Sequence, residues 1–131
     1  MRLLLDTHIW LWFLDGDSRL PSPIKSAILD SENEVWISTI SLFETAIKMR
    51  IGKLNTENHL EKMTEATLAS GIKILPLTAA ETFQYQNIPL LENHKDPFDR
   101  MLLAISNAHN FTFVSIDEKI KLYSDCVQLL K

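Results

Sequence analysis

Hydrophobic and polar positions along this chain follow two different periods, which predicts strands interleaved with helices. Short apolar or β-branched runs, typical of buried strands, occupy residues 2–5, 34–38, 72–77 and 111–116. Between these runs, apolar residues recur at helical spacing and are bounded by turn or capping residues. We expect helices over residues 7–14, 22–31, 41–54, 56–71, 78–86 and 96–110, followed by a short helix and a last strand near 127–130.

Several of these helices carry boundary signals of their own. Pro23 suits the first helical position of the second helix. The helix over 41–54 is expected to end near Gly52, and the next one at Gly71. Thr78 and Glu81 have the spacing of a capping box, which supports a helix that begins at that point.

This order of elements predicts an α/β fold whose sheet is mainly parallel and covered on both faces. Sheets of this kind bind ligands at the carboxyl ends of their strands. Asp6 and Asp117 each follow a predicted strand, although they lie near opposite ends of the chain. We therefore expect both carboxylates at the same edge of the sheet.

Composition sets limits on the class of protein. The chain has 131 residues, of which 46% are hydrophobic, so one domain over 1–131 with a single core is expected. Thirteen Lys and Arg against seventeen Asp and Glu give a net charge of −4, which is not typical of a nucleic-acid binder. If four carboxylates held divalent cations, the remaining thirteen acids would balance the thirteen bases. This arithmetic permits a metal site but does not support one.

The cysteine count and the apolar runs indicate the compartment. Cys126 is the one cysteine of the sequence, which rules out an intrachain disulfide and indicates a reducing environment. The longest apolar run, residues 9–14, is too short to span a bilayer. Asp6 and His8 interrupt the apolar N-terminal stretch, which argues against a signal peptide. We expect a soluble, cytoplasmic protein without a membrane partner.

Two of the acids that follow strands have a structural explanation as helix caps. Asp6 or Thr7 is suited to cap the helix after the first strand, because Asp and Thr side chains accept hydrogen bonds from free backbone N–H groups. Asp117 is suited to cap the short helix that follows it. A shared metal site and a set of caps both remain open at this point.

Glu44 also has two explanations. It lies four residues before Lys48, so the two side chains can form a helical ion pair at the surface. The same helix carries a continuous apolar arc, and Glu44 falls at its rim, where a carboxylate can point along the sheet edge toward a cleft. The arc consists of Leu42, Phe43, Ala46, Ile47 and Ile51.

The segment DPFD at 96–99 combines a helix start with a second acid. Asp96 fits the N-cap, Pro97 fits the first helical position, and together they explain the helix start. Asp99 is favourable in the first turn but is not required there, and it lies at the margin of the helix's apolar face. The helix start therefore explains Asp96 fully and Asp99 only in part.

The chain resembles the PIN-domain family, and in particular ribonuclease toxins of the VapC type, over nearly its whole length. The resemblance rests on LLLDTHIWLW at 3–12, ISLFETAIKMRIGKL at 40–54, HKDPFDRMLLAISNA at 94–108 and FVSID at 113–117. The third segment is the most specific, because helix capping alone does not require its pattern of His, Asp, Phe and Arg.

The resemblance implies a three-layer α/β/α sandwich and a cluster of acids that binds Mg²⁺ or Mn²⁺ and hydrolyses phosphodiester bonds, usually in RNA. Carried over by motif, the metal-binding and catalytic acids are Asp6, Glu44, Asp99 and Asp117. Thr7 and Ser115 correspond to small hydroxyl residues beside the first and last acids, and Asp96 supports the third. Ser115 stands where the family commonly has threonine and keeps the hydroxyl.

These residue types suit the implied chemistry. Mg²⁺ prefers carboxylate and water oxygens, and two such ions can hold the attacking water and the leaving oxygen of a phosphodiester. Asp6, Glu44 and Asp99 are assigned to the principal metal, and Asp117 to a second or water-mediated site. Without metal these carboxylates repel one another, so at least one is expected to have a raised pKa.

Basic side chains near the acids are candidates for RNA phosphates, although each is also explained as a solvated charge. They are Lys48, Arg50, Lys53, Lys95 and Arg100. His8 and His94 are candidates for RNA contact or for support of the site. The aromatic run at 9–13 is expected in the core or at a dimer surface rather than as a base-stacking platform.

The resulting hypothesis is a metal-dependent endoribonuclease, the toxin of a toxin–antitoxin pair, that forms a homodimer and binds a small antitoxin protein. The alternative is a non-catalytic PIN-like module that binds RNA or protein. An aspartyl phosphotransferase is a third class, but it needs a second Asp two residues after Asp6, where this chain has His8.

Overall fold

A computed structural model describes residues 1–52, 59–94 and 96–130 of the chain. Its centre is a parallel sheet of four strands, in the order β3-β2-β1-β4. The strands are β1 (Arg2–Leu5), β2 (Glu34–Ser38), β3 (Lys73–Leu75) and β4 (Thr112–Val114). Leu3 of β1 is in register with Val35 on one side and Thr112 on the other. The predicted α/β class with a parallel sheet is confirmed.

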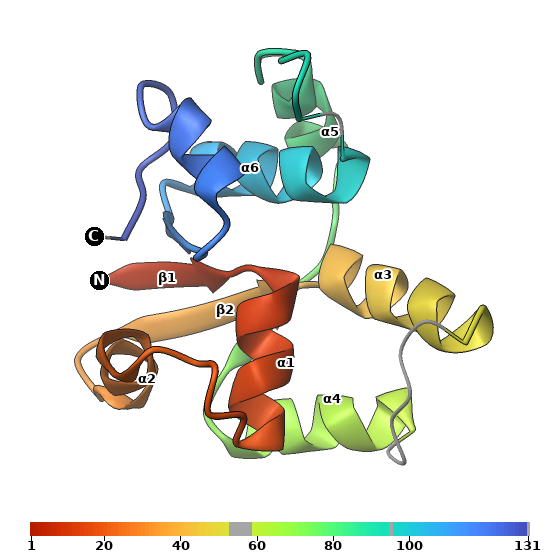
Figure 1. Ribbon diagram of the computed structural model, residues 1–131, viewed down its shortest axis with the longest axis vertical. Helices are drawn as coiled ribbons and strands as arrows, with labels where there is room; N and C mark the ends of the chain where they lie inside the picture. The colour runs from red at the N-terminus through yellow and green to blue at the C-terminus, as the bar shows by residue number, and fades with distance from the viewer. Residues whose placement is uncertain (53–58, 95, 131) are drawn as a thin grey trace.

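Helices cover both faces of this sheet, as predicted. They are α1 (Thr7–Asp15), α2 (Ser22–Leu29), α3 (Thr39–Arg50), α4 (Leu60–Ala69), α5 (Ala79–Tyr85), α6 (Pro97–His109) and the 3₁₀ helix η1 (Glu118–Tyr123). Figure 1 shows α5 and α6 on one side of the strands, and α1, α2 and α4 on the other. Helix α3 continues outward from the end of β2, so it lies beyond the sheet's edge.

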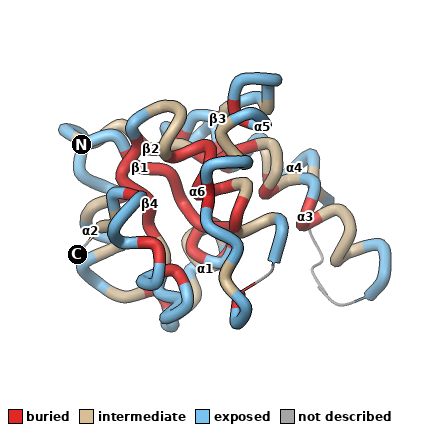
Figure 2. The backbone as a smooth tube through the Cα atoms, turned by 90° about the horizontal axis from the view of Figure 1, so that it is seen from above, coloured by how far each residue is buried: buried red, intermediate tan, exposed pale blue. Residues whose placement is uncertain are grey.

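Residues 3–5 of β1 are fully buried because they contribute side chains to both layers of the core (Figure 2). Leu3 and Leu5 pack with Trp10 of α1 in one hydrophobic cluster. Leu4 points to the opposite face and packs with Leu102 of α6 in the other. The end of β1 is therefore fixed from both faces, and this places Asp6 firmly at the sheet's carboxyl edge.

Some element boundaries differ from the prediction. Helix α3 begins at Thr39 rather than residue 41, because the Ser38 hydroxyl caps it by accepting a hydrogen bond from Ile40 N at 3.0 Å. The prediction of a last strand near 127–130 is wrong. This segment forms only an isolated parallel bridge, between Phe113 and Leu129.

Other boundaries are shorter than predicted, and some lie where the structure gives no description. The capping box of α5 is confirmed, with both Thr78 and Glu81 in place. Strands β3 and β4 are shorter than the predicted 72–77 and 111–116. The predicted end of the helix over 41–54 and the predicted start of the helix over 56–71 lie outside the described residues. Among the helices described, none has the length and apolar character that crossing a bilayer requires.

Candidate functional site

Asp6 lies at the junction between β1 and α1, and its side chain is only 5% exposed. Although it occupies the N-cap position of α1, its carboxylate makes no capping hydrogen bond. Instead it accepts a hydrogen bond from Ser115 Oγ at 2.7 Å, just beyond the end of β4. The Asp6 side chain therefore does not cap α1, and the interpretation of Asp6 as a helix cap is wrong.

Burial raises the pKa of the Asp6 carboxyl, and the Ser115 hydroxyl and nearby His8 only partly offset this effect. The negative charge of Glu44 raises it further. Among the described residues, no lysine or arginine forms an ion pair with Asp6. A buried carboxylate without a basic partner is costly, and a bound cation is one way to remove that cost.

Glu44 is held beside Asp6 by a small polar network. Thr7 Oγ1 donates to Glu44 Oε1 at 2.9 Å and lies 2.8 Å from Ser41 Oγ. Lys48 Nζ lies 3.0 Å from Glu44 Oε2, so the predicted ion pair is present. Glu44 is only 7% exposed, however, so this is not a pair on a solvated surface. Thr7 thus connects α1 to the Glu44 carboxylate rather than capping its own helix.

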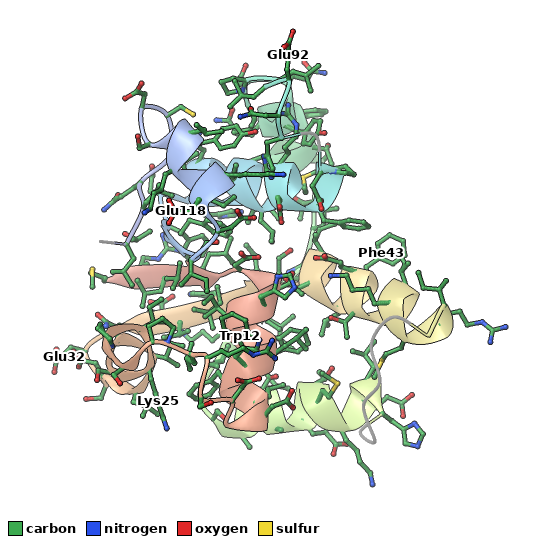
Figure 3. All side chains as sticks on the ribbon, viewed as in Figure 1. Trp12, Lys25, Glu32, Phe43, Glu92 and Glu118 are labelled. Atoms are coloured by element: carbon green, nitrogen blue, oxygen red, sulfur yellow. The ribbon has the colours of Figure 1, made fainter. Side chains whose placement is uncertain are left out.

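The apolar arc predicted on α3 is only partly buried, since Leu42 packs against the core but other members of the arc do not. Phe43 and Ile51 are 57% and 58% exposed, and Figure 3 shows Phe43 projecting from the surface of this helix. The buried residues of α3 are Ser41, Glu44 and Thr45. Helix α3 lies at the edge of the sheet, where its buried polar side chains meet Thr7 while Leu42 and Met49 pack against the core.

The two acids of the DPFD segment have different roles: Asp96 caps α6, and Asp99 contacts His94. Asp96 Oδ1 accepts hydrogen bonds from Phe98 N at 2.8 Å and Asp99 N at 3.2 Å, which confirms the predicted cap. Asp99 does not cap the helix; its Oδ2 lies 3.0 Å from Nε2 of the buried His94. His94 therefore supports an acid of the site, one of the two roles considered for it.

Burial raises the pKa of Asp99 to about 6, although the hydrogen bond to His94 lowers it. The negative charges of Asp6 and Asp96 also raise it. The expectation that at least one acid has a raised pKa is thus confirmed for Asp6 and Asp99. Burial contributes more than the mutual repulsion on which the expectation was based.

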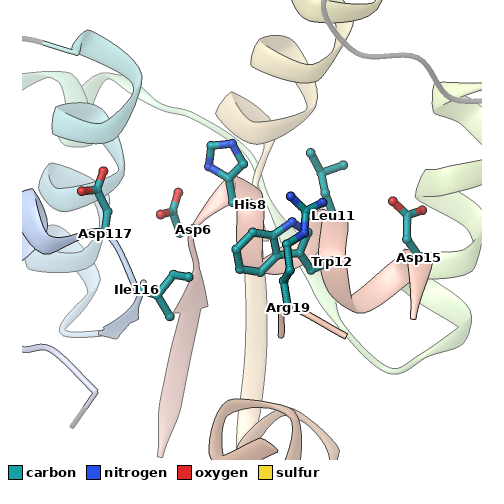
Figure 4. A pocket seen from close by; sticks show the side chains of 8 residues that line it. All are labelled: Asp6, His8, Leu11, Trp12, Asp15, Arg19, Ile116 and Asp117. Carbon is teal, nitrogen blue, oxygen red and sulfur yellow. The ribbon is translucent and has the colours of Figure 1, made fainter. Parts of the chain in front are cut away.

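Asp117 is both a cap and a wall of the pocket that contains Asp6. Its Oδ1 accepts a hydrogen bond from Lys119 N at 3.0 Å, at the start of η1. Asp117 and Asp6 line one side of a pocket of about 430 Å³, with Leu11 and Asp15 on the other side (Figure 4). Both explanations of Asp117 therefore hold, and the sheet edge brings it to Asp6 as predicted.

The basic candidates have diverse surroundings. Lys48 is paired with Glu44, and Arg50 is exposed at the end of α3. Arg100 is only 3% exposed, and its guanidinium donates to the backbone carbonyls of Ile88, at 2.9 Å, and Pro89. This burial removes Arg100 from the candidate phosphate ligands. Lys53 and Lys95 lie outside the described residues.

The acids surround Asp6 without closing into a cage. Over residues 1–52, 59–94 and 96–130, no group of three or more His, Cys, Asp or Glu side chains is close enough together to hold a metal ion. The assigned trio of Asp6, Glu44 and Asp99 therefore does not share a ligating geometry. Mg²⁺ is commonly held by one or two carboxylates and completed by waters. The hard oxygen donors and the unneutralised charge at Asp6 fit an ion of that kind.

Two residues of the site were not singled out from the sequence. Ser41 contacts Thr7, and the hydroxyl of Tyr123 lies 2.8 Å from Nδ1 of His94. Tyr123 comes several residues after the last strand and belongs to no recognisable motif. No sequence signal therefore connects it with Asp99. Ser41 lies outside the apolar arc of its helix, so the periodicity gave no reason to place it in the interior.

Comparisons with known proteins agree with this architecture. A family model described as PIN domain matches residues 3–125. A search of the curated proteins found no match. Among solved structures, the chain is similar to VapBC2 from Rickettsia felis bound to a DNA fragment from its promoter (TM-score 0.71, 19% identity, 100% of this chain and 98% of that one).

Two further structures have similar overlap. One is FitAB bound to an IR36 DNA fragment, with a TM-score of 0.68 and 21% identity over 98% of this chain and 93% of that one. The other is DNA-bound VapBC from Salmonella typhimurium, with a TM-score of 0.67 and 14% identity over 99% and 97%. At these identities the likeness is one of fold.

Proposed function

This chain belongs to the PIN-domain family, and on that premise we propose that it is a metal-dependent endoribonuclease. The observation that carries the proposal is the state of Asp6. It is buried, its pKa is raised, and it has no Lys or Arg ion partner among the described residues. Three further carboxylates surround it: Glu44 and Asp99 are close enough for charge repulsion with Asp6, and Asp117 shares its pocket.

Asp6 would hold a Mg²⁺ or Mn²⁺ ion directly, with the other three acids as direct or water-mediated ligands around it. Such an ion, when bound, supplies a Lewis acid that activates water and neutralises charge on a phosphodiester. The chain's own residues fix the ligands. Ser115 orients Asp6, and Thr7 with Lys48 holds Glu44.

We further propose that the chain is the toxin of a toxin–antitoxin pair. Support comes from the fold: similar structures include the VapBC and FitAB complexes and a toxin–antitoxin complex from Klebsiella pneumoniae. The partner would be a small antitoxin protein, and we propose a homodimer in the cytoplasm, where an RNA substrate is accessible. Lys48 and Arg50, both on α3, would contact the phosphates of this RNA.

A cleavage assay tests the nuclease proposal. Purified protein is incubated with RNA in Mg²⁺ or Mn²⁺, and cleavage is expected to stop when EDTA is added. Asp6→Asn is expected to abolish cleavage, because the amide oxygen is a neutral and weaker ligand. Asp30→Asn, in an exposed turn after α2, is the matched control and is expected to cut at the wild-type rate.

A folded Asp6→Asn protein that cuts RNA at the wild-type rate would contradict the assignment of Asp6. The alternative, a non-catalytic binding module, is favoured by the observation that no three acids converge within the described part of the chain. RNA that binds but is not cut in any divalent ion would support that alternative.

A further inference from the structure

Asp99 is connected to two buried residues outside α6: His94, which precedes this helix, and Tyr123, at the end of η1. His94 Nε2 lies 3.0 Å from Asp99 Oδ2, and His94 Nδ1 lies 2.8 Å from the Tyr123 hydroxyl. His94 is 4% exposed and Tyr123 is 1% exposed. The three side chains form one continuous line of hydrogen bonds that ends at the site.

The chemistry of these groups fixes the direction of the hydrogen bonds. An ionised carboxylate only accepts, so Nε2 of His94 carries the hydrogen shared with Asp99 Oδ2. A neutral imidazole then has a bare Nδ1, which accepts from the Tyr123 hydroxyl. Tyr123 thereby selects the tautomer in which His94 donates to Asp99.

The far end of this line is anchored in the core. The Tyr123 ring packs in the same cluster as Leu102 and Leu103 of α6. The guanidinium of Arg100, itself tied to the carbonyls of Ile88 and Pro89, lies beside the Tyr123 hydroxyl. His94 is therefore held rigidly, and so is the Asp99 oxygen that it contacts.

The start of α6 does not need this arrangement. Asp96 already supplies both capping hydrogen bonds, to Phe98 N and Asp99 N. Asp99 is instead kept partly buried beside the negative charge of Asp6, which raises its pKa. A carboxylate kept there at a cost, with one oxygen fixed by a histidine, is a ligand prepared for a cation.

We propose that His94 is a positioning residue of the metal site: it fixes Asp99 through Oδ2 and leaves Oδ1 for the cation, while Tyr123 orients His94. This inference rests on the proposed metal-dependent function. The known pattern for metal ligands is that a hydrogen-bonded outer partner sets ligand orientation, and its loss weakens metal affinity by about 10- to 100-fold.

A second histidine–carboxylate pair, which joins α6 to α5, provides a matched control. His109 Nε2 lies 2.6 Å from Glu81 Oε1, at the opposite end of the helix. Glu81 serves the capping box of α5, together with Thr78. This pair has the same chemistry as His94–Asp99 but lies away from the acids of the site.

The test measures Mn²⁺ binding by the EPR signal of free Mn²⁺, without RNA, at one pH well above the pKa of Asp99. Four variants are compared with the wild type: His94→Ala, His94→Gln, Tyr123→Phe and His109→Gln. We expect His94→Ala to weaken Mn²⁺ binding by about tenfold or more. His94→Gln is expected to recover most of that loss, because its amide N–H can donate to Asp99 from a similar position.

Tyr123→Phe keeps the ring in the core and removes only the hydroxyl, so a smaller loss of Mn²⁺ affinity is expected. His109→Gln is expected to bind Mn²⁺ as the wild type does, even if it unfolds at a lower temperature. Unchanged affinity in His94→Ala would overturn the inference, and so would an equal loss in His109→Gln, since that would indicate general loosening. These results leave the proposed function standing, whereas a wild-type protein that binds no Mn²⁺ would contradict the function itself.

Discussion

Helices α3 and α6 each bring a carboxylate to the end of β1, but they do so with opposite burial patterns. Helix α6 buries Leu102, Leu103 and Ile105 against the sheet and carries Asp99 at its first turn. Helix α3 buries Ser41, Glu44 and Thr45 and leaves Phe43 and Ile51 exposed.

The two burial patterns have different causes: packing explains that of α6, and the candidate site explains that of α3. Helix α6 is held by apolar burial, and its acid adds to a helix that would form without it. Helix α3 buries polar groups that each need a partner, and the partners are Thr7, Ser41 and Lys48. The buried polar groups of α3 therefore indicate a site, whereas its apolar residues are only partly covered: Leu42 packs against the core, and Phe43 remains exposed although its ring meets that of Phe98 on α6.

The largest effect on stability is expected in the core of α6. Leu103 is fully buried, so Leu103→Ala is expected to lower the free energy of unfolding by about 2–5 kcal/mol. Ile51→Ser, just after the end of α3, is the matched change of an exposed residue and is expected to alter the free energy of unfolding by less than about 0.5 kcal/mol. Urea unfolding measures both. Similar losses for the two variants would mean that the apolar side of α3 is covered in solution.

A smaller effect is expected when the polar network of α3 is broken. Thr7→Val keeps the shape of the side chain and removes the hydroxyl that contacts Glu44 and Ser41. We expect a loss of about 1–3 kcal/mol in the free energy of unfolding, because buried polar atoms lose a partner. RNA cleavage is expected to fall as well, because Glu44 is no longer fixed. A Thr7→Val enzyme with full stability and activity would refute the role of this network.

Sequence reasoning predicted the features that depend on short-range patterns, such as strand ends and helix caps. The strand ends placed Asp6 and Asp117 at one edge, and the caps at Asp96 and Thr78 follow from short-range hydrogen bonding. It failed in part on α3, because periodicity assigns the whole apolar arc to the interior, whereas Phe43 and Ile51 are exposed. A helix that lies beyond the sheet does not obey that assumption.

Two other failures depend on contacts between distant segments. Arg100 was considered as a phosphate ligand, but its guanidinium is satisfied by the backbone of residues 88 and 89. The bond from Tyr123 to His94 joins the C-terminal segment to the start of α6. No pattern within one element encodes either contact, since both arise from the tertiary packing of separate elements.

The smallest effects are expected in the dependence of stability on pH, where the shifts in the pKa of Asp99, on α6, and Glu81, on α5, have opposite signs. The pKa of Asp99 is raised to about 6 from an ordinary 3.8, so the folded state takes up its proton first. Its contribution to stability is present at low pH and is lost as pH rises through about 6. Although burial raises its pKa, hydrogen bonds from Thr78 and His109 hold that of Glu81 at about 2, below an ordinary 4.5. Its contribution is present above about pH 4.5 and is lost as pH falls toward 2.

Thermal unfolding in EDTA across this pH range tests the contrast. Asp99→Asn is expected to be more stable than the wild type at neutral pH, because it removes a buried negative charge, and to lose cleavage. Glu81→Gln is expected to be less stable at neutral pH and to approach the wild type in acid. If Asp99→Asn destabilised the metal-free protein at neutral pH, the burial cost assigned to Asp99 would be wrong.

The most direct test of the account is calorimetric titration of Mg²⁺ into the wild type, Asp6→Asn and Asp30→Asn at neutral pH. The account predicts that the wild type and Asp30→Asn bind the ion with the same affinity and that Asp6→Asn loses this binding while remaining folded. Binding of Mg²⁺ by Asp6→Asn with the wild-type affinity would contradict the claim that Asp6 is the centre of a cation site.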